Sequence, residues 1–127
     1  MKKTNTIVYD LDGTLCTTRE VDDIYYERVK PIPEMIEQLN KFHDEGYKIV
    51  IETARNMITQ SNDVGKVIKN IGEITLKWLR DNNVKYDSIK FGKEYGIIYI
   101  DDKACINDVN EIQKRINKYE EENKWMI

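Results

Sequence analysis

Short apolar runs alternate along this chain with longer segments of helical periodicity, and this alternation limits the possible folds more than any other feature. Strands are predicted at residues 6–9, 47–52, 88–91 and 97–100. Helices are predicted at residues 33–45 and 70–82, and from Asn107 or Asp108 onward. Strands separated by helices pair in parallel through right-handed crossovers. We therefore expect an α/β protein with a three-layer, Rossmann-like architecture around a mostly parallel central sheet.

Local signals mark the ends of the predicted helices. Pro33 suits the first turn of a helix, and Gly46 ends the same segment. Asn70, with Glu73 three positions later, has the pattern of a capping pair and predicts the start of the second helix. Apolar residues at helical spacing predict the buried faces of the first and last helices: Met35, Ile36, Leu39 and Phe42, and Val109, Ile112, Ile116 and Tyr119.

Length and composition indicate one domain over residues 1–127. A chain of 127 residues, 40% of them hydrophobic, can enclose one core and is too short for two. The net charge of −3 comes without a long Lys/Arg run, so we do not expect nucleic acid as a partner. No apolar run approaches the ~20 residues that span a bilayer, and residues 1–6 lack the apolar part of a signal peptide. The expectation is a cytoplasmic protein without a membrane partner, in which Cys16 and Cys105 are free thiols.

Polar side chains suited to chemistry follow each of the four predicted strands. They are Asp10 and Asp12 after the first strand, Thr53 after the second, Lys93 after the third, and Asp101 and Asp102 after the fourth. Because ligands of parallel sheets bind at the carboxyl ends of the strands, these side chains are expected to form one site. Two acid pairs, a hydroxyl and an amine in one place point to phosphoryl transfer.

Each residue type has a role in such a reaction. A carboxylate such as Asp10 can attack phosphorus if a cation screens the repulsion from the phosphate, and Mg²⁺ is the expected ion because it prefers oxygen ligands. Asp12 is the candidate acid and base, which requires a raised pKa. Thr53 and Lys93 can stabilise the transferring group. Asp101 is expected to bind the metal, and Asp102 either binds it as well or contacts it in the outer sphere.

The order of these residues resembles that of the haloacid dehalogenase (HAD) superfamily along most of the chain. The matching segments are DLDGTL at residues 10–15, TARNM at 53–57, FGK at 91–93 and IDDKA at 100–104. More narrowly, the last three segments resemble small HAD phosphatases of capsule and surface-polysaccharide biosynthesis, together with the residues between them: Asn62, Gly65, Lys66, Thr75, Leu76, Trp78 and Leu79. The resemblance implies a Mg²⁺-dependent phosphatase in which Asp10 is the nucleophile and Asp12 the acid and base. It also implies that Asp10, the Asp12 carbonyl and Asp101 bind the metal.

The gaps between the matching segments leave no room for a cap domain. The longest segment without a predicted element near the site is residues 16–32, which we call the flap. A capless site is open, so either the substrate is large or a second subunit covers a small one. The apolar tail at residues 125–127 also favours a contact, and we expect a homo-oligomer.

Candidate substrate contacts lie beside the catalytic set. They are Arg55, Asn56 and Lys66, with Tyr25, Tyr26 and Arg28 in the flap. Arg55 is suited to an anionic group, but it can equally form a structural ion pair with Asp102. The two tyrosines can instead pack the flap against the domain. The expected substrate is a small phosphorylated metabolite, such as a sugar, polyol or amino-alcohol phosphate.

Two other functions use similar residues. A phosphoryl-accepting receiver domain also needs acidic residues, a Thr, a Lys and Mg²⁺, but it carries an adjacent acid pair after its first strand and a single acceptor Asp after its third. Here the order is reversed. A nucleotide or polynucleotide end phosphatase is the closer alternative, because a capless site admits bulky esters. The lack of a basic stripe and of an aromatic stacking platform argues against long nucleic acids.

Overall fold

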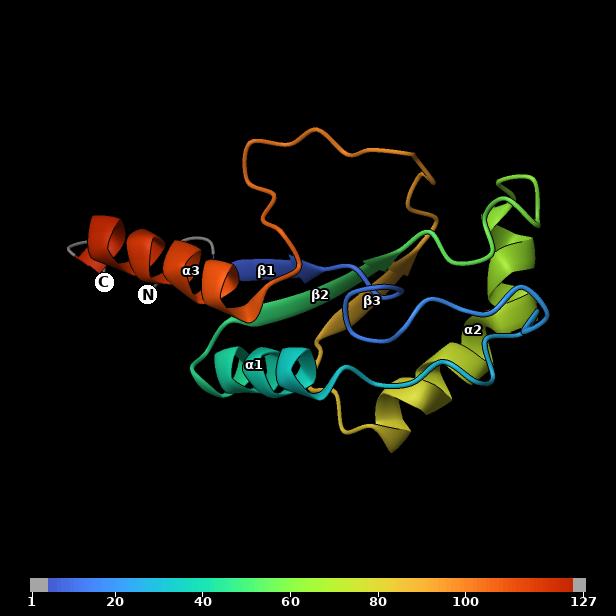
Figure 1. The fold of residues 1–127 in the computed structure, drawn as a ribbon, viewed down its shortest axis with the longest axis horizontal. Coiled ribbons are helices and arrows are strands. Elements are labelled where there is room, and N and C mark those ends of the chain that lie inside the picture. The colour runs from blue at the N-terminus through green and yellow to red at the C-terminus, as the bar shows by residue number, and fades with distance from the viewer. Residues whose placement is uncertain (1–4, 125–127) are drawn as a thin grey trace. The chain divides into compact units, whose positions relative to one another are not determined.

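The computed structural model describes residues 5–124, which form three strands and three helices in alternating order. The elements are β1 (Thr6–Tyr9), α1 (Pro33–Asp44), β2 (Lys48–Thr53), α2 (Val64–Asp81), β3 (Ser88–Phe91) and α3 (Val109–Asn123) (Figure 1). The chain divides into two compact units, residues 6–95 and residues 96–124 together with Asn5. Each unit is described by itself below.

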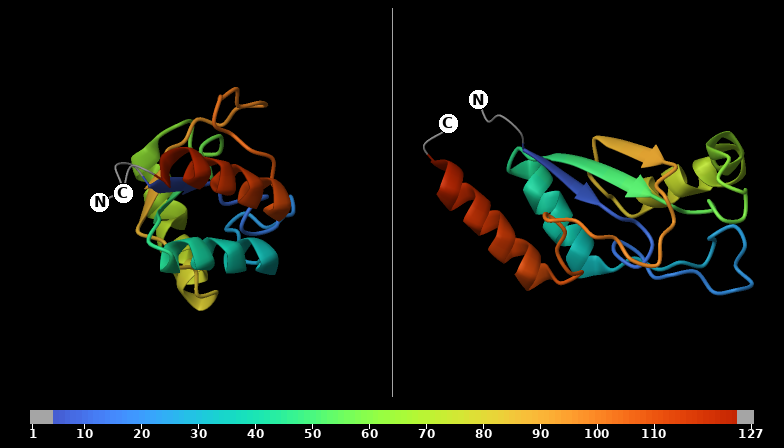
Figure 2. Two further views of the ribbon diagram at one scale, coloured as in Figure 1. Left: turned by 90° about the vertical axis from the view of Figure 1, so that its left-hand side faces the viewer. Right: turned by 90° about the horizontal axis from the view of Figure 1, so that it is seen from above.

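A parallel sheet forms the centre of the first unit. Its strands lie in the order β1-β2-β3, with Val8 opposite Val50 and Ile51 opposite Ile89. Two successive right-handed crossovers that step in the same direction place both connecting helices on one face, and α1 and α2 indeed lie on the same side of the strands (Figures 1 and 2). Because all three strands are parallel, their carboxyl ends meet at one edge of the sheet. This arrangement confirms the predicted α/β class.

The core of the first unit lies between the sheet and these two helices. Ile49 and Ile51 of β2 are fully buried, and both helices turn apolar faces inward. The buried residues are Met35, Ile36, Leu39 and Phe42 on α1, and Val67, Ile71, Gly72, Thr75 and Leu79 on α2. The face of α1 is the one that the sequence predicts, because apolar residues at helical spacing remain on one side wherever the helix packs.

Most element boundaries agree with the sequence predictions. The bounds of β1 and β3 match, and α1 and β2 differ from the prediction by single residues. The predicted start of the second helix at Asn70 is wrong, because α2 begins at Val64. The carboxylate of Asp63 caps it by accepting the Lys66 N–H, whereas the Asn70 amide bonds Asn56 instead. Asp is as good a cap as Asn, and the spacing of Val64, Val67 and Ile71 already carries the helical periodicity of the earlier start.

The predicted strand at residues 97–100 is also wrong. These residues belong to the second unit, adopt no strand, and leave Ile97 and Ile100 at least nine-tenths exposed. A strand exists only through hydrogen bonds to a partner strand, and a four-residue apolar run does not specify one. The apolar composition of this segment therefore predicted strand structure that its backbone does not form here.

The second unit contains α3 and the irregular segment before it. The carboxylate of Asp108 caps the helix by accepting the N–H groups of Asn110 and Glu111, at 2.7 and 3.3 Å. The predicted start of this helix is confirmed, and of its expected inward residues Ile112 is buried while Ile116 and Tyr119 are half-buried. Over residues 5–124, no helix is long and apolar enough to cross a membrane. The tail at residues 125–127, on which the oligomer prediction partly rests, lies outside the described residues.

Candidate active site

The loop after β1 presents Asp10 and Asp12 at the carboxyl edge of the sheet. The Leu11 carbonyl accepts the N–H groups of Leu15 and Cys16, at 2.9 and 3.3 Å, so the loop forms a tight turn. Gly13 takes a φ of +83°, which L residues rarely adopt. Leu11 is fully buried and anchors the turn. The intervening carboxylates remain accessible, since 41% of the Asp10 side chain and 21% of the Asp12 side chain are exposed.

Lys93 follows β3 and faces Asp10 at the carboxyl edge of the sheet. Its Nζ lies 3.8 Å from Asp10 Oδ1, and its backbone N–H donates to the Thr53 carbonyl at 3.1 Å. Burial raises the pKa of Asp10 above its ordinary value, and the Lys93 ammonium opposes that rise. The ammonium can therefore stabilise the carboxylate form that a nucleophile needs.

Thr53 ends β2 beside these two residues and is almost completely buried. Its Oγ1 accepts the Arg55 N–H at 3.0 Å, which fixes the turn that leaves the strand. The hydroxyl hydrogen remains able to donate to an oxygen at the strand edge. The structure thus brings Asp10, Asp12, Thr53 and Lys93 together, as the sequence pattern requires for a common site.

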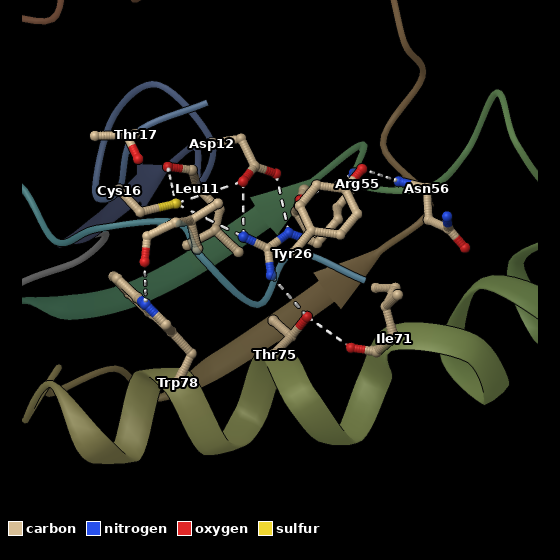
Figure 3. A network of polar contacts seen from close by, with 12 residues as sticks. Leu11, Asp12, Cys16, Thr17, Tyr26, Arg55, Asn56, Ile71, Thr75 and Trp78 are labelled. Atoms are coloured by element: carbon tan, nitrogen blue, oxygen red, sulfur yellow. Dashed lines mark hydrogen bonds and ion pairs between the residues drawn. The ribbon is translucent and has the colours of Figure 1, made fainter. Parts of the chain in front are cut away.

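Arg55 binds Asp12 with a two-pronged ion pair. Nε donates to Asp12 Oδ2 at 3.0 Å, and Nη2 donates to Asp12 Oδ1 at 2.7 Å (Figure 3). Nη1 donates to Thr75 Oγ1 at 3.0 Å, and the guanidinium carbon lies 4.3 Å from the centre of the Tyr26 ring. The planar fork matches a carboxylate, so Arg55 fixes the orientation of Asp12.

This position of Arg55 differs from both sequence-based expectations. The residue is 3% exposed, so its guanidinium does not present a free face to a substrate. Its carboxylate partner in the structure is Asp12 rather than Asp102. The sequence could not distinguish these partners, because an arginine after a strand reaches any carboxylate at the same edge. The structure therefore gives Arg55 the place of a residue that positions Asp12, and its role as a substrate contact stays a prediction.

The other two candidate substrate contacts occupy different surroundings. Asn56 is 5% exposed and adopts a φ of +68°, and its Oδ1 accepts the Asn70 amide at 3.0 Å. Its side chain therefore supports α2, and its role as a substrate contact stays a prediction. Lys66 lies in the first turn of α2 with an exposed side chain. Lys66 remains a candidate for binding substrate.

The flap is closed at its base and organised around a buried carboxylate. The Thr17 N–H donates to the Lys30 carbonyl at 2.8 Å. Asp23, 3% exposed, accepts the N–H groups of Glu27 and Arg28, both at 2.8 Å. These hydrogen bonds lower the pKa of Asp23 against the opposing effect of burial. The flap thus has a defined internal structure.

The flap side chains differ in exposure. Tyr25 is 45% exposed, and Arg28 forms an exposed ion pair with Asp22. Tyr26 packs on Arg55, and its hydroxyl oxygen accepts the Asn56 N–H at 3.1 Å. For Tyr26, the structure agrees with the interpretation that it packs the flap down.

Two residues of the network were missed by the sequence analysis. Thr75 is fully buried on α2, where its hydroxyl donates to the Ile71 carbonyl at 2.7 Å and accepts from Arg55. The Cys16 thiol donates to Asp12 Oδ1 at 3.4 Å. Thr75 could have been noticed in the sequence, because it is a polar residue on the apolar face of a predicted helix. Nothing in the sequence indicates that the Cys16 thiol contacts Asp12. Burial, with the Asp12 charge, raises the pKa of this thiol to about 12, so Cys16 is not a nucleophile near neutral pH.

Asp101 and Asp102 belong to the second unit, in an exposed segment where Asp101 Oδ1 accepts the Lys103 N–H at 2.9 Å. Within residues 6–95, no three His, Cys, Asp or Glu side chains are grouped so as to hold a metal ion. The metal-binding roles of Asp101 and Asp102 stay predictions.

Gly92 lies between β3 and Lys93, and its close contact with Val64 of α2 can be tested by substitution. Its φ is +97°, and a Cβ there would lie 2.8 Å from Val64 Cγ2. Gly92→Ala should therefore lower the free energy of unfolding by about 1–3 kcal/mol, through backbone strain and overpacking. Gly46→Ala is the matched control, because Gly46 has a φ of +99° with no atom within 4 Å of such a Cβ. Urea unfolding should find Gly92→Ala the less stable; equal losses would contradict the predicted clash with Val64.

A crystallised structural-genomics target from Vibrio cholerae is 37% identical to this chain. The match covers 91% of this chain and 99% of that protein, with a TM-score of 0.77. The chain belongs to the same protein family. No protein-family model and no functionally curated protein matches the sequence.

Two further solved structures are similar at low sequence identity. One belongs to the Pnkp1/Rnl/Hen1 complex, at 15% identity and a TM-score of 0.52, covering 93% of this chain and 36% of that one. The other is the D,D-heptose 1,7-bisphosphate phosphatase of B. bronchiseptica, at 12% identity and a TM-score of 0.51, covering 92% and 64%. At these identities the likeness concerns the fold. This chain shares with them a Rossmann-like α/β fold.

Proposed function

We propose that this protein is a Mg²⁺-dependent phosphatase that hydrolyses a small phosphate monoester through an aspartyl-phosphate intermediate. The observation that carries this proposal is the pairing of two differently held carboxylates at one strand end. Asp10 is accessible beside the Lys93 ammonium, and Asp12 is oriented by Arg55. One carboxylate is therefore suited to attack and the other to proton transfer.

In the first half of the proposed reaction, Asp10 is the nucleophile. A carboxylate oxygen of Asp10 forms a bond to phosphorus while the bond from phosphorus to the ester oxygen breaks. Protonated Asp12 gives its proton to the departing alkoxide, which leaves as an alcohol. Lys93 and the Thr53 hydroxyl are placed to stabilise the negative charge of the transferring group.

In the second half, the aspartyl-phosphate is hydrolysed. Asp12, now a carboxylate, accepts a proton from a water molecule as the water oxygen bonds to phosphorus. The bond between phosphorus and the Asp10 oxygen breaks, which releases inorganic phosphate and restores both side chains. The same residue serves as acid and then as base, so a fixed orientation of Asp12 benefits both steps.

Mg²⁺ would neutralise charge between the nucleophile and the phosphate when it is bound. The donor chemistry at the strand edge fits this ion, because Asp10 offers an accessible carboxylate and the β1 loop offers backbone carbonyls. The sequence resemblance adds Asp101 to the Asp10 carboxylate and the Asp12 carbonyl, with Asp102 either a further ligand or an outer-sphere contact. The B. bronchiseptica phosphatase of similar fold was crystallised with magnesium and phosphate, which supports the same cofactor here.

Removal of the metal should abolish the activity. We expect EDTA to stop phosphate release and excess Mg²⁺ to restore it, whereas Ca²⁺ should restore little because its larger, looser coordination is poorly suited to the transfer. Phosphate release is measured before and after dialysis against EDTA. Full activity after dialysis into metal-free buffer would contradict metal dependence.

A sugar, polyol or amino-alcohol phosphate is the proposed substrate class, with a role in capsule or surface-polysaccharide precursor synthesis. Three observations support a small ester. The resemblance noted above is to glycan-pathway phosphatases, the B. bronchiseptica protein of similar fold acts on a heptose bisphosphate, and the net charge of −3 disfavours polyanions. The alternative is a nucleotide or polynucleotide end phosphatase, for which the fold likeness to the Pnkp1/Rnl/Hen1 complex is the supporting observation.

A substrate comparison separates these two classes. The panel contains sugar, polyol and amino-alcohol phosphates, nucleoside monophosphates and a 3′-phosphorylated oligonucleotide, all at one Mg²⁺ and salt concentration. We expect the largest kcat/KM for a small non-nucleotide ester. If the oligonucleotide is preferred by about tenfold, equivalent to ~1.4 kcal/mol in transition-state binding, the glycan assignment fails and the alternative replaces it.

A further inference from the structure

The guanidinium of Arg55 is held by groups from three separate parts of the first unit. Nε and Nη2, on one edge of the guanidinium, donate to the carboxylate of Asp12, which follows β1. Nη1 donates to the hydroxyl of Thr75 on α2. The ring of Tyr26, in the flap, lies over the guanidinium with 4.3 Å between the ring centre and Cζ (Figure 3). The two hydrogen-bonding partners act in the plane of the group, whereas Tyr26 acts on its face.

The position of Tyr26 is defined by more than this stacking. Its hydroxyl oxygen accepts the N–H of Asn56, the residue after Arg55, at 3.1 Å. Both residues of this bond have positive φ, +60° for Tyr26 and +68° for Asn56. Such conformations cost free energy in residues other than glycine and persist where the surrounding structure imposes them. The contact between the flap and the Arg55 turn is therefore a specific interaction and not incidental packing.

The rest of the flap is held independently of Tyr26. Asp23 organises its tip through backbone N–H groups, and the Thr17 N–H closes its base on Lys30. The indole of Trp78 on α2 donates to the Val29 carbonyl at 3.3 Å. A change at Tyr26 should thus leave the flap folded and remove chiefly its contact with Arg55.

We propose that Tyr26 is a positioning residue that couples the seating of the flap to the acid chemistry of Asp12. The Tyr26 ring shields one face of the Arg55 guanidinium from water. It also keeps the guanidinium coplanar with the Asp12 carboxylate, so that both carboxylate oxygens accept a hydrogen bond. Without it, water reaches the guanidinium and Asp12 gains rotational freedom. This inference rests on the proposed phosphatase function and goes beyond it, because it makes flap closure a condition for cleaving esters with poor leaving groups.

Two aryl phosphate esters with different leaving groups test the proposal. Phenyl phosphate has a leaving group that benefits from protonation, whereas 2,4-dinitrophenyl phosphate has one that leaves without a proton. The measured quantity is the ratio of kcat/KM for phenyl phosphate to kcat/KM for the dinitrophenyl ester. General acid catalysis contributes 10²–10⁴-fold in enzymes, so we expect Tyr26→Leu to lower this ratio by about tenfold. Tyr26→Phe, which keeps the ring, should stay close to the wild-type ratio.

Two controls separate positioning from general damage. Tyr86→Leu changes another half-buried tyrosine, in the loop that precedes β3, and should leave the ratio unchanged. In an Asp12→Asn background the acid is already absent, so adding Tyr26→Leu should not lower the ratio further. A further loss in that double variant would mean that Tyr26 does not act through Asp12, which overturns the proposal.

The outcomes distinguish this proposal from the proposed function. If Tyr26→Leu slows both esters equally, Tyr26 has only a structural role, and the phosphatase function stands without the coupling. If the wild-type protein hydrolyses no phosphate monoester, the proposed function fails, and the coupling to acid catalysis fails with it. NMR then still decides the physical contact: the Arg55 Nε–H signal should exchange with water faster in Tyr26→Leu than in Tyr86→Leu, and equal exchange would refute the contact as well.

Discussion

Asp10→Asn should abolish phosphate release. An amide is a poor nucleophile and a poor ligand for Mg²⁺, so the variant loses both the attacking group and part of the metal site. We expect kcat to fall by roughly a thousandfold or more, which corresponds to about 4 kcal/mol in the activation barrier. The change is nearly isosteric at a partly exposed position, so the fold should survive. Phosphate release under saturating Mg²⁺ is the direct measurement.

A matched control identifies what the loss means. Asp81→Asn removes an exposed carboxylate that pairs with Lys77 at the end of α2 and is not among the strand-end residues, so it should leave turnover unchanged. Circular dichroism of both variants checks that each remains folded. Substantial activity in Asp10→Asn would rule out the covalent mechanism. Trapping of a phosphorylated protein in the wild type, and not in Asp10→Asn, would support it.

Arg55→Met should strongly destabilise the protein. The substitution keeps an unbranched apolar stem but removes the guanidinium, so Asp12 loses its partner and the buried Thr75 hydroxyl loses its donor. Breaking a buried ion pair typically costs 3–5 kcal/mol, and because Asp12 is 21% exposed we expect about 3 kcal/mol here. That is a large part of the 5–15 kcal/mol by which domains are usually stable. Urea unfolding monitored by tryptophan fluorescence measures the change.

The same variant decides between two roles for Arg55. A residue that holds Asp12 should, when changed, lower stability and kcat together, whereas a substrate contact should mainly raise KM. Arg55→Lys keeps the charge but lacks the planar fork, so we expect it to recover little of either property. Arg28→Met is the control, since Arg28 is an exposed arginine paired with Asp22, and exposed pairs contribute little. Unchanged stability with raised KM in Arg55→Met would restore the substrate-contact interpretation.

The sequence alone determined the α/β class and most of the first unit. Alternating apolar runs and helical periodicity fixed β1, β3 and α1 almost to the residue, because these signals are local and do not depend on what the element packs against. It also placed Asp10, Asp12, Thr53 and Lys93 at strand ends, and parallel topology then brings strand ends to a common edge. The start of α2 was harder to predict, since Asp and Asn both favour the N-cap position. Only the folded structure shows that Asp63 caps the helix and that Asn70 bonds Asn56.

Only the tertiary structure decided the partner of Arg55 and the contacts of the flap. The ion pair joins Arg55 to Asp12 across 43 positions of sequence, and Tyr26 and Thr75 reach the same guanidinium from other elements. Periodicity and local propensity carry no information about such pairings. An arginine has several possible carboxylates within reach, and its choice depends on burial and on which partner matches the planar fork. For this reason the sequence could place the candidate residues at the strand ends, whereas the contacts that orient them required the fold.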